Sequence, residues 1–225
     1  MDMDTTRRKH AHEEMLAAFS KGEADILLGT QMIVKGHDYA NVTLVGILAA
    51  DLSLHEQDFR SGEKTFQLLC QAAGRAGRGE KAGDVIIQTY SPEHYAIKTA
   101  AEHSYENFFK EEYTYRQLMG YPPCAHMLVI LIQSGNESQS VIARLRIEKM
   151  IEQSQVGQEV PVQILAPGQA SLSKLKDVYR QVLYLKHKDK ETLLDLKGRL
   201  EPVLEKHPMF AGIMIQFDFD PLSHY

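Results

Sequence analysis

Cysteine is scarce in this sequence of 225 residues, and tryptophan is absent. The two cysteines, Cys70 and Cys124, are far apart and form no C-x-x-C pair, so neither a disulfide framework nor a zinc cluster is predicted. No apolar run approaches the roughly 20 residues that a membrane helix needs. The polar, acidic start of the chain, with Asp2 and Asp4, is unlike a secretory signal. We therefore expect a cytoplasmic protein with reduced thiols, no metal site and no membrane association.

The composition is otherwise that of an ordinary globular protein, with 44% hydrophobic and 24% charged residues. A chain of this length accommodates one large domain or two small ones, and we predict two. The net charge of −5 is unevenly distributed, because residues 1–120 carry 13 basic and 18 acidic side chains, whereas residues 121–225 carry 12 of each. The second half nevertheless contains a basic segment over 174–190, formed by Lys174, Lys176, Arg180, Lys186, Lys188 and Lys190.

Aromatic side chains are interleaved in this basic segment at Tyr179 and Tyr184. Phosphate contacts from lysine and arginine, combined with base stacking on tyrosine, are typical of single-stranded DNA binding. The alternative interpretation is a solvated face of a β-hairpin. The segment by itself does not decide between the two.

Residues 1–92 show the pattern of an α/β domain. Apolar spacing predicts a helix over 5–21 that ends at Gly22, and a second helix over 64–76. Short apolar runs predict buried parallel strands at 24–29, 42–50 and 84–90. Strands that alternate with helices favour a doubly wound α/β lobe, and the sheet is expected to be incomplete because the chain leads directly into a helix.

Residues 93–123 are expected to form a helical connector that is broken at Gly120-Tyr-Pro-Pro. Its aromatic stripe, which we assign to packing, consists of Tyr105, Phe108, Phe109, Tyr113 and Tyr115. Residues 124–225 form the second predicted domain. The expected elements are strands at 127–133, 160–166, 179–186 and 212–219, with helices at 137–153 and 189–205. The order βαββαβ is that of a ferredoxin-like domain.

The strongest functional signal is the segment Gln71-Ala-Ala-Gly-Arg75-Ala-Gly-Arg78-Gly79. Two arginines three residues apart share one side of a helix end, and the glycines allow the backbone to approach another surface. A guanidinium group can bridge phosphoryl oxygens and, when delivered from a second lobe, can neutralise charge that develops during phosphoryl transfer, as an arginine finger does. The alternative is a glycine-rich surface turn with solvated arginines.

A second segment, Gly29-Thr-Gln-Met-Ile-Val-Lys-Gly-His-Asp38, directly follows a predicted strand. Loops in this position carry ligands in open α/β sheets. Thr30 and Lys35 supply a hydroxyl and a cation that suit a nucleic-acid phosphate, whereas Gly36 and Asp38 provide a tight turn and a carboxylate for a ribose or an arginine. In this order, the two segments resemble motifs V and VI of superfamily 2 helicases, whose second motor lobe contacts DNA and completes the ATP site.

The resemblance narrows to the PriA-type replication-restart DNA helicases, also called primosomal protein N′. It is carried by ILLGTQMIVKGHDYANVTLVGILAADLSL, DFRSGEKTFQLLCQAAGRAGRG, RQLMGYPPCAHMLV and FDFDPL, which together extend over essentially the whole chain. The resemblance implies a RecA-like lobe followed by the family's C-terminal domain. It also implies that Gln71, Arg75 and Arg78 belong to the ATP interface, with Arg78 as the finger, that Gly36 and Asp38 lie beside them, and that Thr30 and Lys35 line the DNA track.

The family resemblance further implies ATP and Mg²⁺ as cofactors, and branched or single-stranded DNA, the single-strand-binding protein SSB and primosome proteins as partners. The sequence departs from the family in lacking a G-x-x-x-x-G-K-[ST] segment; Gly62-Glu-Lys-Thr65 only approaches it. The acidic Mg²⁺ motif, the N-terminal DNA-binding domain and the zinc-binding cysteines of the family are also absent. We therefore expect a fragment that cannot hydrolyse ATP alone. Two further hypotheses are a stand-alone nucleic-acid-binding adaptor and an interaction module for SSB.

Two further segments of the sequence carry weaker signals. His55-Glu-Gln-Asp58 approaches a zinc-protease motif but lacks its second histidine, so no metal is predicted there. Asp51 follows an apolar strand, where it can either close an active-site cleft or cap the next turn, and both interpretations remain open.

Overall fold

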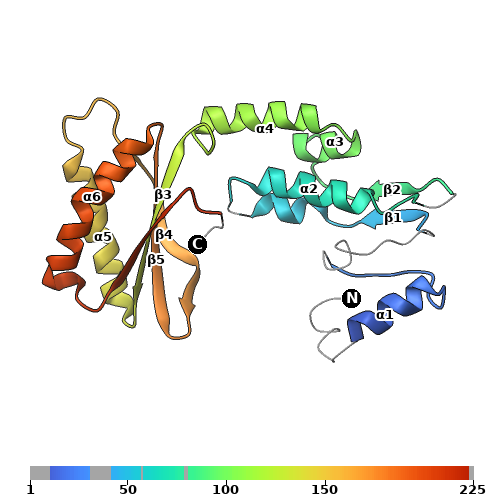
Figure 1. Ribbon diagram of the computed structural model, residues 1–225, viewed down its shortest axis with the longest axis horizontal. Helices are drawn as coiled ribbons and strands as arrows, with labels where there is room; N and C mark the ends of the chain where they lie inside the picture. Colours follow the sequence, from blue (N-terminus) through green and yellow to red (C-terminus); the bar gives the residue numbers. More distant parts are fainter. Residues whose placement is uncertain (1–10, 31–41, 57, 79–80, 223–225) are drawn as a thin grey trace. The chain divides into compact units, whose positions relative to one another are not determined.

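The computed structural model describes residues 11–30, 42–56, 58–78 and 81–222 (Figure 1). The chain divides into two compact units, Met1–Glu112 and Tyr113–Tyr225. None of the helices in the described ranges is long and apolar enough to cross a membrane.

Helix α1 (Ala11–Ser20) confirms the described part of the first predicted helix. Its end is set by Gly22, which has a φ of +75°. In this left-handed conformation the amide of Gly22 donates to the carbonyl of Phe19 at 3.1 Å, and the amide of Glu23 donates to that of Ala18 at 2.9 Å. These are the two hydrogen bonds of a Schellman motif, so glycine ends the helix as predicted.

The sheet described in the first unit consists of two parallel strands, β1 (Leu44–Ile47) and β2 (Asp84–Ile87). Both are shorter than predicted, and β1 is followed by the 3₁₀-helix η2 (Ala50–His55). The strand predicted at 24–29 is wrong, since this segment has no regular structure and Ile26 is 84% exposed. A strand needs a hydrogen-bonded neighbour, and no described segment pairs with 24–29.

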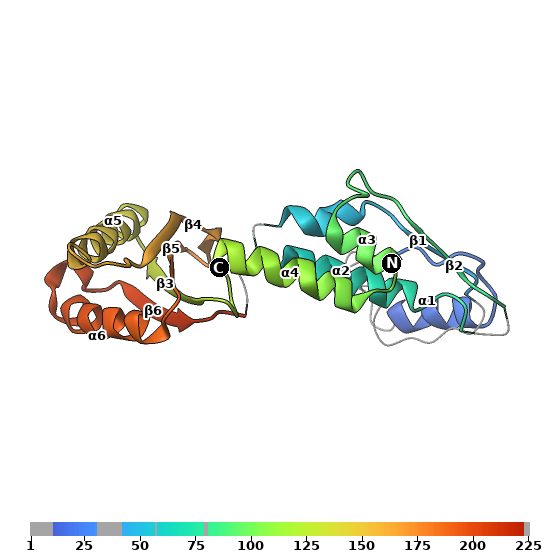
Figure 2. The same cartoon turned by 90° about the horizontal axis from the view of Figure 1, so that it is seen from above.

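Helix α2 (Ser61–Ala73) connects η2 to β2, and α3 (Tyr95–Ala101) and α4 (Tyr105–Met119) follow β2. Figure 2 shows α3 and the start of α4 against α2. Of the aromatic stripe, only Phe108 is buried, where its ring stacks on Phe66 with centroids 4.1 Å apart. Tyr105, Phe109, Tyr113 and Tyr115 are each more than one third exposed, so burial supports the assignment to packing at Phe108, and for the other four it stays a prediction. The buried core is formed by Ala50, Phe66, Leu69, Ala96, Ile97, Ala100 and Phe108.

The second unit has the element order that the sequence predicted. It contains β3 (His126–Ser134), α5 (Glu137–Ser154), β4 (Gln163–Leu175), β5 (Val178–His187), α6 (Lys190–Lys206), the 3₁₀-helix η3 (Pro208–Phe210) and β6 (Met214–Phe219). The strands lie in the order β4-β5-β3-β6, and all three pairings are antiparallel. Asn136 caps α5 by accepting from the amide of Gln139, and Asp189 caps α6 by accepting from Glu191 and Thr192.

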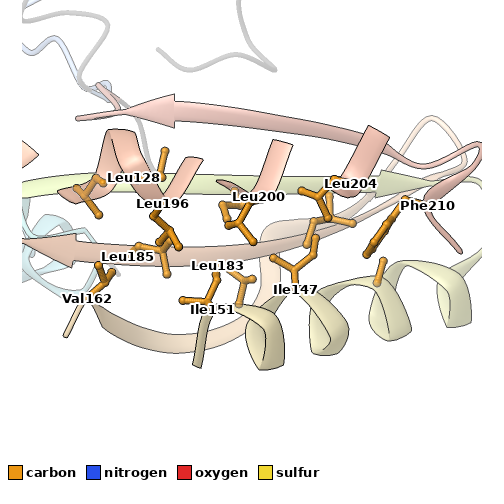
Figure 3. Close-up of a cluster of buried hydrophobic side chains, with 14 residues drawn as sticks. Leu128, Ile147, Ile151, Val162, Leu183, Leu185, Leu196, Leu200, Leu204 and Phe210 are labelled. Carbon is orange, nitrogen blue, oxygen red and sulfur yellow. The ribbon is translucent and has the colours of Figure 1, made fainter. Parts of the chain in front are cut away.

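Both helices of the second unit lie on the same side of the sheet (Figure 1). Alternation along the strands directs every second side chain towards them. On β3 and β5 these side chains include Leu128, Ile130, Leu183 and Leu185, all of which are completely buried. Figure 3 shows that they meet α5 and α6 through Ile147, Ile151, Leu196, Leu200 and Leu204. One continuous apolar core therefore holds this unit together.

Candidate functional site

The glycine-arginine segment forms the end of α2 and the turn that follows it. Gln71 lies exposed in the last turn of the helix, and Gly74 caps it by donating its amide to the carbonyl of Cys70 at 3.0 Å. The amide of Arg75 then donates to Ala72 at 3.0 Å. The structure therefore brings the three predicted ATP-interface residues, Gln71, Arg75 and Arg78, to one helix end.

The turn is anchored to the backbone just before β1. The amide of Gly77 donates to the carbonyl of Val42 at 2.9 Å. Gly77 has a φ of +70°, and a Cβ atom there would lie 2.7 Å from the backbone nitrogen of Gly83. A Cβ atom on Gly83 would in turn collide with the backbone of Gly77. These glycines are thus required by close contact between two backbone segments as well as by conformation.

The two arginines occupy different environments in this turn. Arg78 is exposed, and its Nε atom donates to the carbonyl of Gly74 at 2.7 Å, so the side chain folds back over the end of α2. A cation in this position also interacts favourably with the carbonyl end of the helix dipole. Arg75 is only partly exposed.

The second predicted segment lies almost entirely outside the described residues. Lys35, Gly36 and Asp38 are among the residues that the structure does not describe, whereas Thr30 lies at its border and is exposed. The chain is described again from Val42, the residue whose carbonyl binds Gly77. The glycine-arginine turn is therefore attached one residue after the end of the undescribed stretch.

An ion-pair network stabilises the start of α2. The carboxylate of Asp58 lies 2.9 Å from Nζ of Lys64 and 3.1 Å from Nε of Arg60, and its side chain is only 3% exposed. Burial raises the pKa of Asp58, but the hydrogen bonds from Lys64 and Arg60 outweigh this effect and lower the pKa overall. Lys64 also pairs with Glu56 at 3.2 Å. The segment that approaches a phosphate-binding loop thus uses its lysine to hold the helix start.

Asp51 does not cap the next turn, because its hydrogen bonds go to the chain that follows β2. It is buried at the carboxyl ends of β1 and β2, where it accepts hydrogen bonds from Oγ1 of Thr89 at 2.7 Å and from the amides of Tyr90 and Ser91 at 2.9 and 3.1 Å. The hydrogen bond from Thr89 is the largest of several that lower the pKa of Asp51. This carboxylate fixes the chain after β2.

The basic segment 174–190 does not form one surface patch. Lys174 and Lys176 lie at the turn of the β4–β5 hairpin, whereas Lys188 and Lys190 lie beyond the other end of β5. A strand of 10 residues separates them by about 30 Å. Lys186 is 5% exposed, so counting it as part of an exposed patch was wrong.

At the hairpin turn, several predicted DNA contacts already bind each other. Lys176 and Asp177 both have positive φ values, 48° and 63°, as a type I′ turn requires. Nζ of Lys174 lies 2.9 Å from a carboxylate oxygen of Asp177 and 5.0 Å from the ring centre of Tyr179. The bond to Asp177 is the first cause of a raised pKa for Lys174. Because strand side chains alternate, Tyr179 and Arg180 point to opposite faces of the sheet.

Lys186 joins the end of α4 to the sheet of the second unit. Its Nζ donates to the carbonyl of Met119 at 2.7 Å and lies 4.0 Å from the ring centre of Tyr121. Burial lowers the pKa of this lysine. Its burial could be recognised in the sequence, because Lys186 lies on the same face of β5 as the buried residues Val182 and Tyr184. A cation over an aromatic ring offsets part of its desolvation.

Two protein-family models match the chain. One, described as the helicase conserved C-terminal domain, matches residues 2–80, and the other, described as the primosomal protein N C-terminal domain, matches residues 117–222. Replication restart protein PriA of Bacillus subtilis (strain 168) is 42% identical over 98% of the chain, and PriA of Synechocystis sp. is 40% identical over 99%. PriA of Haemophilus influenzae is 36% identical over 98% of the chain. The chain belongs to the PriA family. The family predicted from the sequence is therefore confirmed.

The chain spans about a quarter of the length of the first PriA relatives, 27% of the Bacillus subtilis protein and 26% of the Synechocystis protein. The helicase match includes α2 and the arginines of its turn. The second match begins in the last turn of α4 and includes all of the four-stranded sheet. In the part of the chain that the structure describes, no cluster of three or more His, Cys, Asp or Glu side chains could hold a metal ion.

Proposed function

We propose that the chain forms part of the second motor lobe and the C-terminal domain of an ATP-dependent DNA helicase that restarts replication. Parallel β1 and β2 with α2 between them support a RecA-like lobe. The order βαββαβ, with the strands arranged β4-β5-β3-β6, supports a ferredoxin-like C-terminal domain. We keep residues 1–92, 93–123 and 124–225 as the proposed domain limits.

The observation that carries this proposal is the turn after α2. It places Gln71, Arg75 and Arg78 at one helix end, and the bond from Gly77 to Val42 fixes this end beside the first strand. A guanidinium group has five N–H donors, and Nε of Arg78 uses one of them on Gly74. In our proposal this bond orients Arg78 towards the γ-phosphate of ATP held by a preceding lobe, where it stabilises charge in the transition state.

DNA is the proposed second ligand. Thr30 and Lys35 are assigned to the motor track, with Gly36 and Asp38 on the nucleotide side. In the C-terminal domain the proposed contacts lie at the hairpin turn and consist of Lys174, Lys176, Tyr179 and Arg180. Since Lys174 covers the ring of Tyr179, we assign this hairpin to phosphate contacts rather than to base stacking.

The remaining assignments concern the whole protein. We propose ATP and Mg²⁺ as cofactors bound by a preceding lobe. We also propose zinc for the whole protein, although this sequence, with two cysteines, does not contain the family's zinc-binding cysteine motifs. Branched forks, SSB and primosome proteins are the proposed partners, and the cytoplasm is the proposed location. The chain alone is proposed to bind DNA without hydrolysing ATP, because positioning and charge neutralisation supply most of phosphoryl-transfer catalysis.

DNA-stimulated ATP hydrolysis tests the proposal. It is measured for this chain and for a version extended upstream to include an ATP-binding lobe, each with and without Arg78→Ala. We expect hydrolysis only from the extended chain, a loss in kcat of about 10³-fold with Arg78→Ala, and unchanged DNA affinity. Arg146→Ala removes an exposed arginine from α5 and is the matched control.

Three outcomes contradict the proposal in different ways. Full activity of the extended Arg78→Ala variant removes the finger assignment. Loss of DNA binding in that variant reassigns Arg78 to the DNA track. If no version hydrolyses ATP while salt-dependent DNA binding persists, the chain is a nucleic-acid-binding adaptor.

A further inference from the structure

Helix α4 carries a buried carboxylate that neither the helicase motifs nor the family resemblance assigns. Glu112 is 5% exposed, although its helix is otherwise largely exposed. One of its oxygens accepts a hydrogen bond from the hydroxyl of Tyr95 on α3 at 2.7 Å. Burying a carboxylate costs free energy that an apolar side chain at the same place avoids, so packing alone does not explain this residue.

The pair formed by Tyr95 and Glu112 rests directly on the backbone of α2. A Cβ atom on Gly62 would lie 2.6 Å from the hydroxyl oxygen of Tyr95 and 3.0 Å from the carboxylate of Glu112. Gly62 is the second residue of α2 and is buried. Since its φ is not in the left-handed region, glycine is needed here for space. The absence of a side chain lets both polar groups reach the helix.

A second contact lies one turn further along both helices. Phe66, four residues after Gly62, stacks on Phe108, four residues before Glu112, with ring planes only 13° apart. Residues four apart share one face of a helix, so α4 meets α2 at two successive turns. These two contacts define both the distance between the helices and the rotation of α2 about its axis.

Helix α2 is the element that carries the proposed arginine finger. An α-helix rises about 1.5 Å per residue, so Ala73, the last residue of α2, lies about 16 Å along the axis from Gly62, and Arg75 follows in the turn. A small rotation at the start of the helix is therefore carried to its end. A catalytic arginine tolerates little displacement, because misplacement by about 1 Å can cost about 100-fold in rate.

We propose that Glu112 and Tyr95 are positioning residues that set the orientation of α2, and with it the placement of Arg75 and Arg78. The inference rests on the proposed function only for its catalytic consequence. The contact between the helices and its effect on the turn Gly74–Gly77 can be tested in the chain itself.

Hydrogen exchange provides the first test. The variants are Glu112→Leu, Tyr95→Phe and Gly62→Ala, which respectively remove the acceptor, remove the donor and displace the pair. We expect the amides of Gly74–Gly77, bonded to the carbonyls of Cys70, Ala72, Ala73 and Val42, to exchange about tenfold faster. Glu112→Gln retains an acceptor for the Tyr95 hydroxyl and should restore slow exchange.

Two comparisons separate positioning from general stability. The amides of Gln88 and Ala50, bonded to the carbonyls of Ile47 and Gln88 at the other end of the sheet, should keep their exchange rates. Glu111→Leu, at the exposed neighbouring position, should have no effect. Equal acceleration at both ends of the sheet, an effect of Glu111→Leu, or failure of Glu112→Gln to restore the turn each overturns the proposal.

The second test uses the extended chain and its ATP hydrolysis. Tyr95→Phe and Gly62→Ala should lower kcat about tenfold without changing KM for ATP, since an arginine finger acts in the transition state. Unchanged kcat in both variants overturns the catalytic consequence. If the unmutated extended chain hydrolyses no ATP, the proposed function fails, and the exchange rates still decide whether Glu112 positions α2.

Discussion

Replacing Gly77 by alanine tests whether the turn after α2 depends on space as well as on conformation. Gly120→Ala is the matched control, because Gly120 also has a positive φ, +63°, but has no atom within 4 Å of an added Cβ. Both changes place alanine in the left-handed region at a cost of about 1 to 2 kcal/mol. Gly77→Ala also drives the Cβ to 2.7 Å from the backbone of Gly83, and overpacking of this kind adds about 1 to 3 kcal/mol. We expect about 2 to 5 kcal/mol for Gly77→Ala and about 1 to 2 kcal/mol for Gly120→Ala.

Because the chain has two units, one unfolding curve does not give both free energies. Hydrogen exchange measured by mass spectrometry assigns the loss of stability to peptides from each unit. Gly77→Ala should weaken protection in β1 and β2 and leave β3 unchanged, whereas Gly120→Ala should leave β1 and β2 unchanged. Equal losses of free energy in the two variants would refute the argument, since they would show that the contact with Gly83 adds nothing.

Three further outcomes follow from burial and charge. Leu196→Ala should destabilise the second unit by about 2 to 5 kcal/mol, measured by hydrogen exchange of peptides from that unit, and Leu194→Ala, 38% exposed on the same helix, by clearly less. Asp58 has a lowered pKa in the folded chain, so its contribution to stability is present above its unfolded pKa of about 3.8 and is lost as the pH falls through the folded value. Asp58→Asn should therefore lower the free energy of unfolding at neutral pH. It should also reduce the change of this free energy with pH, measured by urea unfolding at pH 3 to 7. Lys176→Ala should reduce the slope of log DNA affinity against log salt concentration by about one, whereas Lys186→Ala, at a buried position, should leave that slope unchanged. A smaller slope in Lys186→Ala together with an unchanged slope in Lys176→Ala would contradict a DNA contact at the hairpin turn.

The second unit was predictable because its signals are local. Alternating apolar residues define β3 and β5, and Asp189 caps α6 where the sequence placed the cap. Strand β4 was predicted at 160–166 but extends over Gln163–Leu175. Its extension pairs with β5 only after two shifts in register, and such irregular pairing leaves no simple alternation in the sequence.

The first unit was less predictable because its elements depend on partners distant in sequence. An apolar run such as 24–29 has the composition of a buried strand, but composition does not provide the neighbouring strand that it needs. The prediction that the basic segment forms one patch was wrong for a similar reason, because residues close in the sequence lie at opposite ends of β5. Glu112 could have been noticed as an acid four residues after Phe108, on the apolar face of its helix.

The irregular course of β4 also affects how this molecule behaves beside other copies of itself. Strand β4 lies at the edge of the four-stranded sheet, where unpaired backbone groups can bind a strand from another chain. The pairing of β4 with β5 shifts in register between Leu165 and Gly168 and again between Gln169 and Lys174. Pro167, within the first shift, has no N–H group to donate. A strand that approaches β4 therefore meets no long regular edge, which disfavours self-association of the molecule through this side of the sheet.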